Sequence, residues 1–191
     1  MMDLDAEFEA MKQSLKTGVR VVTAPQLFAT PRDLAAQMVE LAGIEPGHMV
    51  LEPSAGTGNI IGAMGGRMFG HNPERGGVVA VEINGELCRH LGREFPLTQV
   101  LQRDFLECVN ELGTFDRILM NPPFENGADI KHIKHAFSML KPGGVLVAIC
   151  AGGPRQAREL EPMAAYWEPL PAGTFKNAGT MVNSVLLTME K

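Results

Sequence analysis

The chain has 191 residues, of which 45% are hydrophobic and 20% charged, and its formal net charge is −5. This composition allows a packed core and excludes a chain that is disordered throughout. The acidic balance argues against a protein whose whole surface binds nucleic acid, although it is compatible with a local basic face.

The first expected elements lie near the N-terminus. Apolar residues at helical spacing predict a helix over residues 3–16, and a short β-branched stretch follows over residues 19–24. We expect residues 1–24 to form a helical extension and the whole chain to form one catalytic domain. Thr30 and Pro31 are typical of a helix start, with Thr30 as the N-cap and Pro31 in the first helical position.

Short apolar stretches alternate with helical patterns along the rest of the chain. Strands are predicted over residues 48–52, 78–83, 98–101, 115–120, 145–151 and 182–189. Helices are predicted to begin near Asn59, Asn84, Asp129 and Pro154, the last of them reaching residue 165. Strands that alternate with helices form a mostly parallel sheet with helices on both faces, so we expect an α/β fold.

The sequence carries no signal for a membrane segment, secretion or a metal site. No apolar run approaches the ~20 residues of a membrane-spanning helix, and the acidic N-terminus is unlike a secretory signal. Cys88, Cys108 and Cys150 are widely spaced and form no CxxC pair, so neither a disulfide framework nor a zinc site is expected. These features favour a cytoplasmic protein with buried thiols.

The segment Asn121-Pro122-Pro123-Phe124 directly follows the strand predicted over residues 115–120. Two prolines cannot continue a strand, because each lacks a backbone N–H and holds φ at about −65°. The chain must therefore leave the sheet rigidly at this point. It offers an amide side chain, a carbonyl without a ladder partner and an aromatic ring, which suits holding a flat amino group.

Other polar or small residues follow the remaining strands, and ligands bind at the carboxyl ends of strands in open parallel sheets. Gly56 and Gly58 would let a ligand approach backbone N–H groups at a helix start, although ordinary turns also carry such glycines. Glu82 could accept hydrogen bonds from ribose hydroxyls or could be a solvated carboxylate. Asp104 could accept a bond from an adenine amino group or could cap the next helix.

The run Val50-Leu51-Glu52-Pro53-Ser54-Ala55-Gly56-Thr57-Gly58, followed by Asn121-Pro122-Pro123-Phe124, resembles the class I S-adenosylmethionine-dependent methyltransferases. More narrowly, it is similar to the N6-adenine DNA methyltransferases. The resemblance extends from about residue 26 to the C-terminus. It implies a doubly wound, mostly parallel, seven-stranded sheet with the last strand antiparallel, and S-adenosyl-L-methionine as cofactor. Ser54 stands where the broad pattern has glycine.

The resemblance also implies roles for individual residues. Those implied to bind the cofactor are Phe28, Thr30, Pro31, Glu52, Pro53, Ser54, Ala55, Gly56, Gly58, Glu82, Ile83, Asp104 and Phe105. Those implied to be catalytic are Asn121, Pro122, Pro123 and Phe124. The Asn121 side-chain oxygen and the Pro122 carbonyl would accept the two N–H bonds of an adenine amine. Phe124 would stack on the extruded base, and Gly173-Thr174-Phe175 resembles a segment that lines the target-base pocket.

The expected partner is nucleic acid, DNA rather than RNA, as in restriction-modification systems. No element that could enter a DNA groove is identifiable, so we expect no separate target-recognition domain. A recognition subunit, low specificity or a substrate other than duplex DNA would each account for this. Alternatives are methylation of an RNA base or a protein glutamine, and a non-catalytic cofactor-binding subunit. A nicotinamide-dependent oxidoreductase is disfavoured, because Gly62 falls one place too late for G-x-G-x-x-G.

Basic residues and histidines cluster after the predicted catalytic segment. His132 and His135 lie three apart on one predicted helix, but no third ligand is nearby, so a solvated helix face is expected rather than a metal site. The candidate phosphate contacts are His132, Lys131, Lys134, Arg155 and Arg158.

Overall fold

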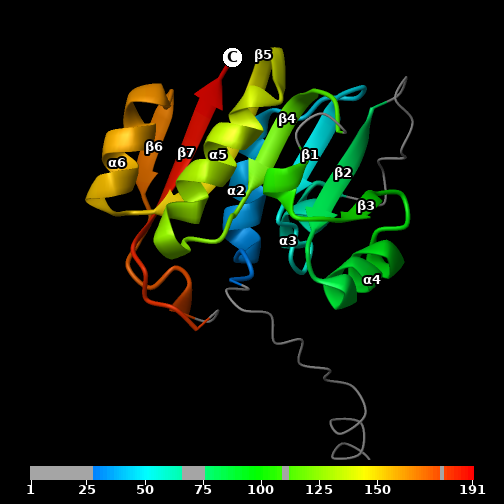
Figure 1. Ribbon diagram of the computed structural model, residues 1–191, viewed down its shortest axis with the longest axis horizontal. Helices are drawn as coiled ribbons and strands as arrows, with labels where there is room; N and C mark the ends of the chain where they lie inside the picture. The colour runs from blue at the N-terminus through cyan, green and yellow to red at the C-terminus, as the bar shows by residue number, and fades with distance from the viewer. Residues whose placement is uncertain (1–27, 66–75, 109–111, 177–178) are drawn as a thin grey trace, which may run out of the picture.

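The computed structural model describes residues 28–65, 76–108, 112–176 and 179–191 (Figure 1). The helix predicted over residues 3–16 and the β-branched stretch over residues 19–24 lie outside the described residues. None of the described helices is long and apolar enough to cross a membrane.

The described chain alternates strands and helices as expected. The strands are β1 (Met49–Pro53), β2 (Gly77–Glu82), β3 (Gln99–Gln102), β4 (Phe115–Met120), β5 (Leu140–Ala151), β6 (Tyr166–Pro169) and β7 (Ser184–Glu190). The α-helices are α2 (Arg32–Ala42), α3 (Asn59–Ala63), α4 (Gly85–Glu94), α5 (Ala128–Ser138) and α6 (Pro154–Leu160). Short 3₁₀ turns are η1 (Phe105–Glu107), η2 (Glu125–Gly127) and η3 (Glu161–Met163).

The strands form one seven-stranded sheet in the order β3-β2-β1-β4-β5-β7-β6. Neighbouring strands from β3 to β5 pair in parallel, whereas β7 pairs antiparallel with both β5 and β6. The predicted mostly parallel sheet with an antiparallel last strand is therefore confirmed. The strand order reverses at β1 and β4, so the carboxyl ends of these two strands mark the point where ligands bind in such sheets.

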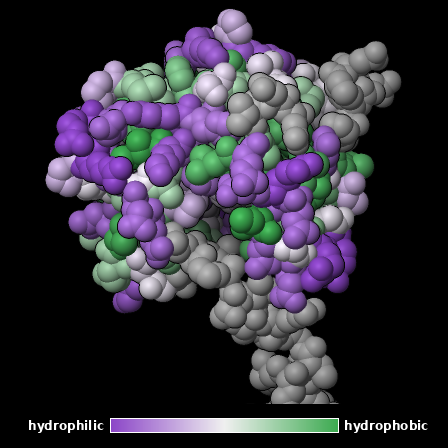
Figure 2. All heavy atoms as spheres, in the orientation of Figure 1, coloured by the Kyte–Doolittle hydropathy of each residue, from purple (hydrophilic) through white to green (hydrophobic). Residues whose placement is uncertain are grey.

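Alternate residues of each strand face two different hydrophobic cores. Leu51, Ile118 and Leu146 belong to the core that includes residues of α5, whereas Val50 and Leu119 belong to the core that includes residues of α2 and α3. In Figure 1, α5 and α6 accordingly lie in front of the sheet and α2 behind it. Figure 2 shows that the side turned to the viewer carries mainly hydrophilic side chains, with hydrophobic residues in isolated patches.

Two predicted boundaries are wrong. Strand β5 begins at Leu140 instead of residue 145, because Leu140 pairs with Phe115 before the ladder shifts register at a bulge. The helix from Pro154 ends at Leu160, well before residue 165. The ring of Pro162 removes a backbone N–H that a continuing helix would need, and a short 3₁₀ turn takes its place.

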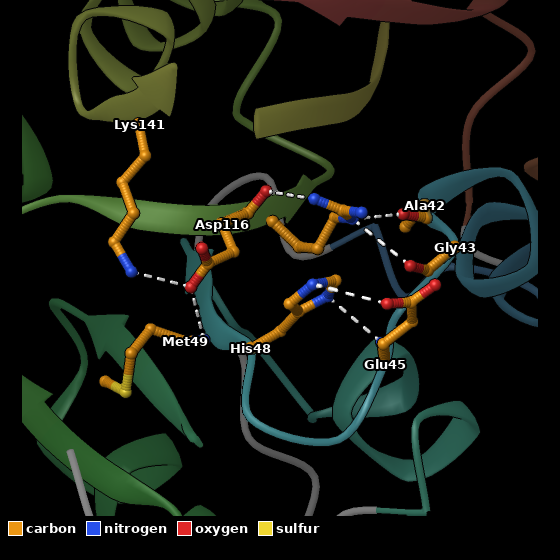
Figure 3. Close-up of polar contacts among 8 residues, drawn as sticks. Ala42, Gly43, Glu45, His48, Met49, Asp116 and Lys141 are labelled. Carbon is orange, nitrogen blue, oxygen red and sulfur yellow. Dashed lines mark hydrogen bonds and ion pairs between the residues drawn. The ribbon is translucent and has the colours of Figure 1, made fainter. Parts of the chain in front are cut away.

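Polar contacts join the amino-terminal ends of strands β1 and β4 to their surroundings (Figure 3). These strand ends lie opposite the carboxyl ends that mark the ligand side. The Asp116 carboxylate accepts bonds from the Met49 amide at 2.8 Å and from the Lys141 ammonium at 2.7 Å. Burial alone would raise the pKa of Asp116, but these hydrogen bonds outweigh it and lower the pKa below its ordinary value. The Arg117 guanidinium binds the Ala42 carbonyl at the end of α2. Helix α2 is thereby tied to β4.

The start of α3 depends on a glycine that no other residue can replace without strain. Gly58 has φ of +77°, and a Cβ added there would lie 2.5 Å from the Phe95 ring and 2.7 Å from Leu91. We expect Gly58→Ala to lower the free energy of unfolding by about 2 kcal/mol, measured by urea denaturation. Gly92→Ala is the matched control, because nothing lies near its Cβ position in α4; it should stabilise by about 0.5–1 kcal/mol. Equal effects of the two substitutions would contradict this account.

Candidate active site

A cavity of about 480 Å³ lies at the carboxyl ends of β1 to β4. Many of the residues predicted from the sequence meet in its wall: Phe28, Thr30, Glu52, Ser54, Ala55, Gly56, Glu82, Ile83, Asp104, Phe105, Asn121 and Pro123. Five predicted residues lie outside the wall: Pro31, Pro53, Gly58, Pro122 and Phe124. The wall also contains residues that the sequence analysis did not assign to the cofactor site: Ala29, Thr57, Asn59, Ile60, Val81, Asn84, Leu87, Arg103 and His132.

The turn after β1 forms the floor of the cavity. Ser54 has φ of +62°, and Gly56 and Gly58 also adopt left-handed conformations, at +55° and +77°. This tight path lets the Gly56 amide donate to Glu82 at 2.8 Å and the Ala55 amide donate to the Val81 carbonyl at 3.0 Å. The turn is therefore fastened to the end of β2. The left-handed position of Ser54 explains physically why glycine is suited to this place.

Replacement of Ser54 by glycine is a direct test of this strain. The only described polar contact of the Ser54 hydroxyl is a long one, 3.5 Å from Nδ1 of His132, so little bonding is lost. We expect Ser54→Gly to raise the free energy of unfolding by about 1 kcal/mol in urea denaturation. Asn126→Gly is the matched variant, because Asn126 also has a positive φ, +55°, and should gain stability similarly. A loss of stability in Ser54→Gly would show that the hydroxyl matters more than the backbone.

Glu82 is fixed by backbone amides at the end of β2. Its two carboxylate oxygens accept from the Gly56 and Asn84 amides, each at 2.8 Å, and its side chain is buried. Each oxygen has a second lone pair, so the carboxylate can still accept from a ligand hydroxyl on the cavity side. Asn84 in turn caps α4, as predicted, by accepting from the Glu86 and Leu87 amides.

Glu52 is the most deeply buried acid of the cavity, with 2% of its surface exposed. Burial raises its pKa well above the ordinary value of 4.5; the hydrogen bond from the Ile61 amide opposes this, and the nearby charge of Glu82 adds to it. Among the described residues, no basic side chain is paired with Glu52. A buried carboxylate without a cation is costly, so the cavity favours a ligand that carries positive charge.

The wall beyond β3 combines an acid, an aromatic ring and a histidine. Asp104 caps η1 by accepting from the Leu106 amide at 2.9 Å, which confirms the capping alternative, and it also lines the cavity. His132 was expected on a solvated helix face, and this is wrong: it is buried, and its ring lies 5.7 Å from that of Phe105. Burial lowers the pKa of His132; the charges of Asp104 and Asp129 oppose this shift, and that of His135 adds to it.

Asn121 is held by its amide nitrogen. Nδ2 donates to the Phe28 carbonyl at 2.9 Å and to the Thr30 hydroxyl at 3.2 Å. Its two N–H groups are thereby engaged, which leaves the oxygen Oδ1 without a donor among the described residues. The predicted N-cap role of Thr30 is wrong, because its hydroxyl is engaged by Asn121 and α2 has Pro31 at its N-cap position without a side-chain cap.

Phe124 lies beside the cavity rather than in its wall. Its ring is 9% exposed and packs between Phe28, 6.2 Å away and tilted by 31°, and Phe175, 6.3 Å away and edge-on. In this arrangement Phe28 is the ring of the three that lines the cavity.

The basic candidates for phosphate contacts differ in their surroundings. Lys134 pairs with Glu159 at 2.8 Å, and Arg158 lies 3.5 Å from the same carboxylate. Arg155 is exposed and donates to the Asn126 carbonyl at 3.2 Å, in the turn that follows Phe124. Of Lys134, Arg155 and Arg158, Arg155 is the residue that hydrogen-bonds to the segment of residues 121–127. Among the described residues, no group of three or more His, Cys, Asp or Glu side chains could hold a metal ion.

Comparison with known proteins decides the family. Residues 46–162, more than half of the chain, match the family described as the methyltransferase small domain. The chain belongs to this family. It is a class I S-adenosylmethionine-dependent methyltransferase by family and fold.

Individual relatives are distant. The chain is 29% identical over 144 residues to the type II restriction enzyme and methyltransferase RM.BcgI of Heyndrickxia coagulans, covering 63% of this chain but only 23% of that protein. The structure of TrmN from Thermus thermophilus has a TM-score of 0.68 and 20% identity, covering 87% of this chain and 52% of that one. A type I restriction-modification methyltransferase subunit from Streptococcus thermophilus has a TM-score of 0.68 and 19% identity, covering 86% and 45%.

The cavity of this methyltransferase domain suits the cofactor that its family uses. S-adenosyl-L-methionine is cationic at its sulfonium and its ammonium groups, and the buried Glu52 carboxyl is the candidate group for a complementary charge. The cavity volume lies within the usual range for small-molecule sites, about 300–1,000 Å³. Candidate contacts for the ribose and adenine are Glu82 and Asp104, whose carboxylates line one side of the same space.

Proposed function

We propose that the protein transfers a methyl group to an exocyclic amino nitrogen, namely N6 of adenine in DNA. The observation that supports this proposal most directly is the geometry of Asn121. Because its NH2 group is engaged by Phe28 and Thr30, its oxygen is free to accept a hydrogen bond from a flat amino group.

Asn121 and Pro122 supply the two acceptors that such an amine needs. Oδ1 of Asn121 and the Pro122 carbonyl accept its two N–H bonds; no described residue donates to either oxygen in the structure. The amine lone pair, normally delocalised into the base, is thereby turned towards the methyl group, and the positive charge that develops on nitrogen is stabilised. The cofactor supplies a methyl on a sulfonium, whose C–S electron pair stays on sulfur, and the new N-methyl amine releases one proton to solvent.

DNA is favoured by the identity of the curated relative. RM.BcgI is named as a restriction enzyme and methyltransferase, and restriction-modification enzymes act on DNA. Because this chain spans less than a quarter of RM.BcgI, we further propose that target recognition comes from a partner subunit or another segment.

The test is incubation of the protein with tritiated S-adenosyl-L-methionine and, separately, DNA, RNA and protein fractions. We expect label in DNA, recovered as N6-methyladenine after nucleoside digestion. Label only in RNA or in protein would replace the substrate class, and it would keep the amino-nitrogen chemistry only if the labelled nucleoside or amino acid carries the methyl group on nitrogen. Binding of S-adenosylhomocysteine by calorimetry without label in any fraction would instead indicate a non-catalytic subunit.

A further inference from the structure

Hydrogen bonds through Asn59 and Thr30 connect the turn at the floor of the cavity to the acceptor residue Asn121. Asn59 is the first residue of α3, directly after the turn of residues 54–58, and its amide nitrogen donates to the Thr30 carbonyl at 2.7 Å. The Thr30 hydroxyl accepts from Asn121 at 3.2 Å, and the Phe28 carbonyl accepts from the same nitrogen at 2.9 Å. Segment 28–30 is thus held between α3 on one side and the end of β4 on the other.

The environment of Asn59 defines which way its own amide faces. The Thr57 hydroxyl donates to Asn59 Oδ1 at 3.3 Å, so the oxygen faces the turn and the nitrogen faces Thr30. Thr30 is buried, with 4% of its surface exposed. A buried carbonyl and a buried hydroxyl that each have one defined partner are costly to leave unpaired, so this arrangement resists rotation.

We propose that Asn59 and Thr30 are positioning residues that set the orientation of the Asn121 amide. The two ends of an amide have opposite hydrogen-bonding character, since the oxygen accepts and the nitrogen donates. If the amide turned over, its NH2 would face the amine of the target and the two donors would repel each other. The Thr30 hydroxyl and the Phe28 carbonyl prevent this by binding the nitrogen, and Asn59 holds Thr30 in place.

This inference rests on the proposed function for the role of the Asn121 oxygen, but its first measurement does not depend on catalysis. The side-chain NH2 resonances of Asn121 are identified in ¹⁵N-labelled protein by their absence in Asn121→Ser. In the native protein we expect slow exchange of both hydrogens with solvent. In Thr30→Val one of the two Asn121 amide hydrogens loses the Thr30 hydroxyl as its acceptor. In Asn59→Ala the Thr30 carbonyl loses the amide that donates to it, so Thr30 is no longer held in place. We expect exchange to be about 3- to 10-fold faster in each variant.

Two controls separate orientation from general damage. Thr30→Ser keeps the hydroxyl and should restore slow exchange of the Asn121 resonances. Thr114→Val makes the same chemical change at an exposed position away from the cavity and should leave those resonances unchanged.

The second measurement is the rate of methyl transfer, with the DNA, RNA or protein fraction that becomes labelled as the substrate. With saturating cofactor, Thr30→Val should lower kcat about tenfold, and the Kd for S-adenosylhomocysteine should change by a smaller factor. Unchanged Asn121 resonances in both Thr30→Val and Asn59→Ala would overturn the inference, as would altered resonances with an unchanged kcat. If the resonances respond as expected but the native protein labels no fraction, the proposed function fails while the orienting contacts stand.

Discussion

Asn121→Ala is expected to lower the kcat of methyl transfer by about two to three orders of magnitude with little loss of cofactor affinity. The alanine side chain removes one of the two acceptors for the target amine, in a site where such groups act on developing charge. Loss of one preorganised hydrogen-bonding group of this kind typically lowers kcat about 10²- to 10³-fold. The bonds of Asn121 Nδ2 go to Phe28 and Thr30, so the floor of the cavity keeps its own contacts. The measurement is kcat with labelled cofactor, beside the Kd for S-adenosylhomocysteine.

The control and a graded variant sharpen this test. Asn183→Ala removes an exposed amide in the loop before β7 and should leave kcat unchanged. Asn121→Asp keeps an acceptor oxygen but lacks the N–H groups that bind Phe28 and Thr30, so it should retain intermediate activity. Retained activity in Asn121→Ala would remove the proposed role of the acceptor pair, whatever the cofactor affinity.

The position of the cavity followed from the sequence because strand ends are easy to recognise. Glu52, Glu82, Asp104 and Asn121 each come where an apolar run stops, and the carboxyl ends of parallel strands share one edge. The double proline made the exit at Asn121 unambiguous, since no strand can continue through it. These are local signals, and the sheet brings them together without further information.

The misplaced roles are those that depend on contacts between distant segments. Thr30 looked like a helix cap because its neighbour is proline, but the end of β4 supplies Asn121, which takes its hydroxyl. His132 looked solvated because lysines surround it in sequence, whereas packing of α5 beside Phe105 buries it. The sequence also did not show that the rings of Phe28 and Phe175 pack against Phe124. A local sequence pattern cannot predict which residues from distant parts of the chain contact a given side chain in the fold.

Glu52→Gln is expected to make the protein more stable and the cofactor weaker in binding. Burial raises the pKa of Glu52, so above its ordinary value of 4.5 the folded protein must either keep a proton that the unfolded chain has released or bury a charge, and a neutral amide avoids both costs. The amide oxygen can still accept from the Ile61 amide, which Glu52 now binds at 3.1 Å. We expect a gain of at least about 1 kcal/mol in the free energy of unfolding without ligand.

The pH dependence of this gain follows from the direction of the pKa shift. An acid with a raised pKa in the folded state stabilises the fold while protonated, below its ordinary value of 4.5, and that contribution is lost as the pH rises through the folded pKa. The two proteins should therefore have similar stability in acid. Their stabilities should separate as the pH rises above 4.5 and reach a constant difference once Glu52 is ionised in the native protein. Urea denaturation at a series of pH values measures this separation.

Cofactor binding should favour glutamate over glutamine at position 52, which is opposite to the effect on stability without ligand. The carboxylate that is costly in the empty cavity becomes favourable when a cationic ligand enters, and hydrogen bonds to charged groups are worth about 1.5–3 kcal/mol. Glu52→Gln should therefore weaken binding of S-adenosyl-L-methionine by roughly 10- to 100-fold in calorimetry. In the native protein the affinity should rise with pH until Glu52 is ionised without ligand, and the variant should lack this rise. A variant that is both less stable and equally tight in binding would show that Glu52 is a structural acid that makes no use of the cofactor's charge.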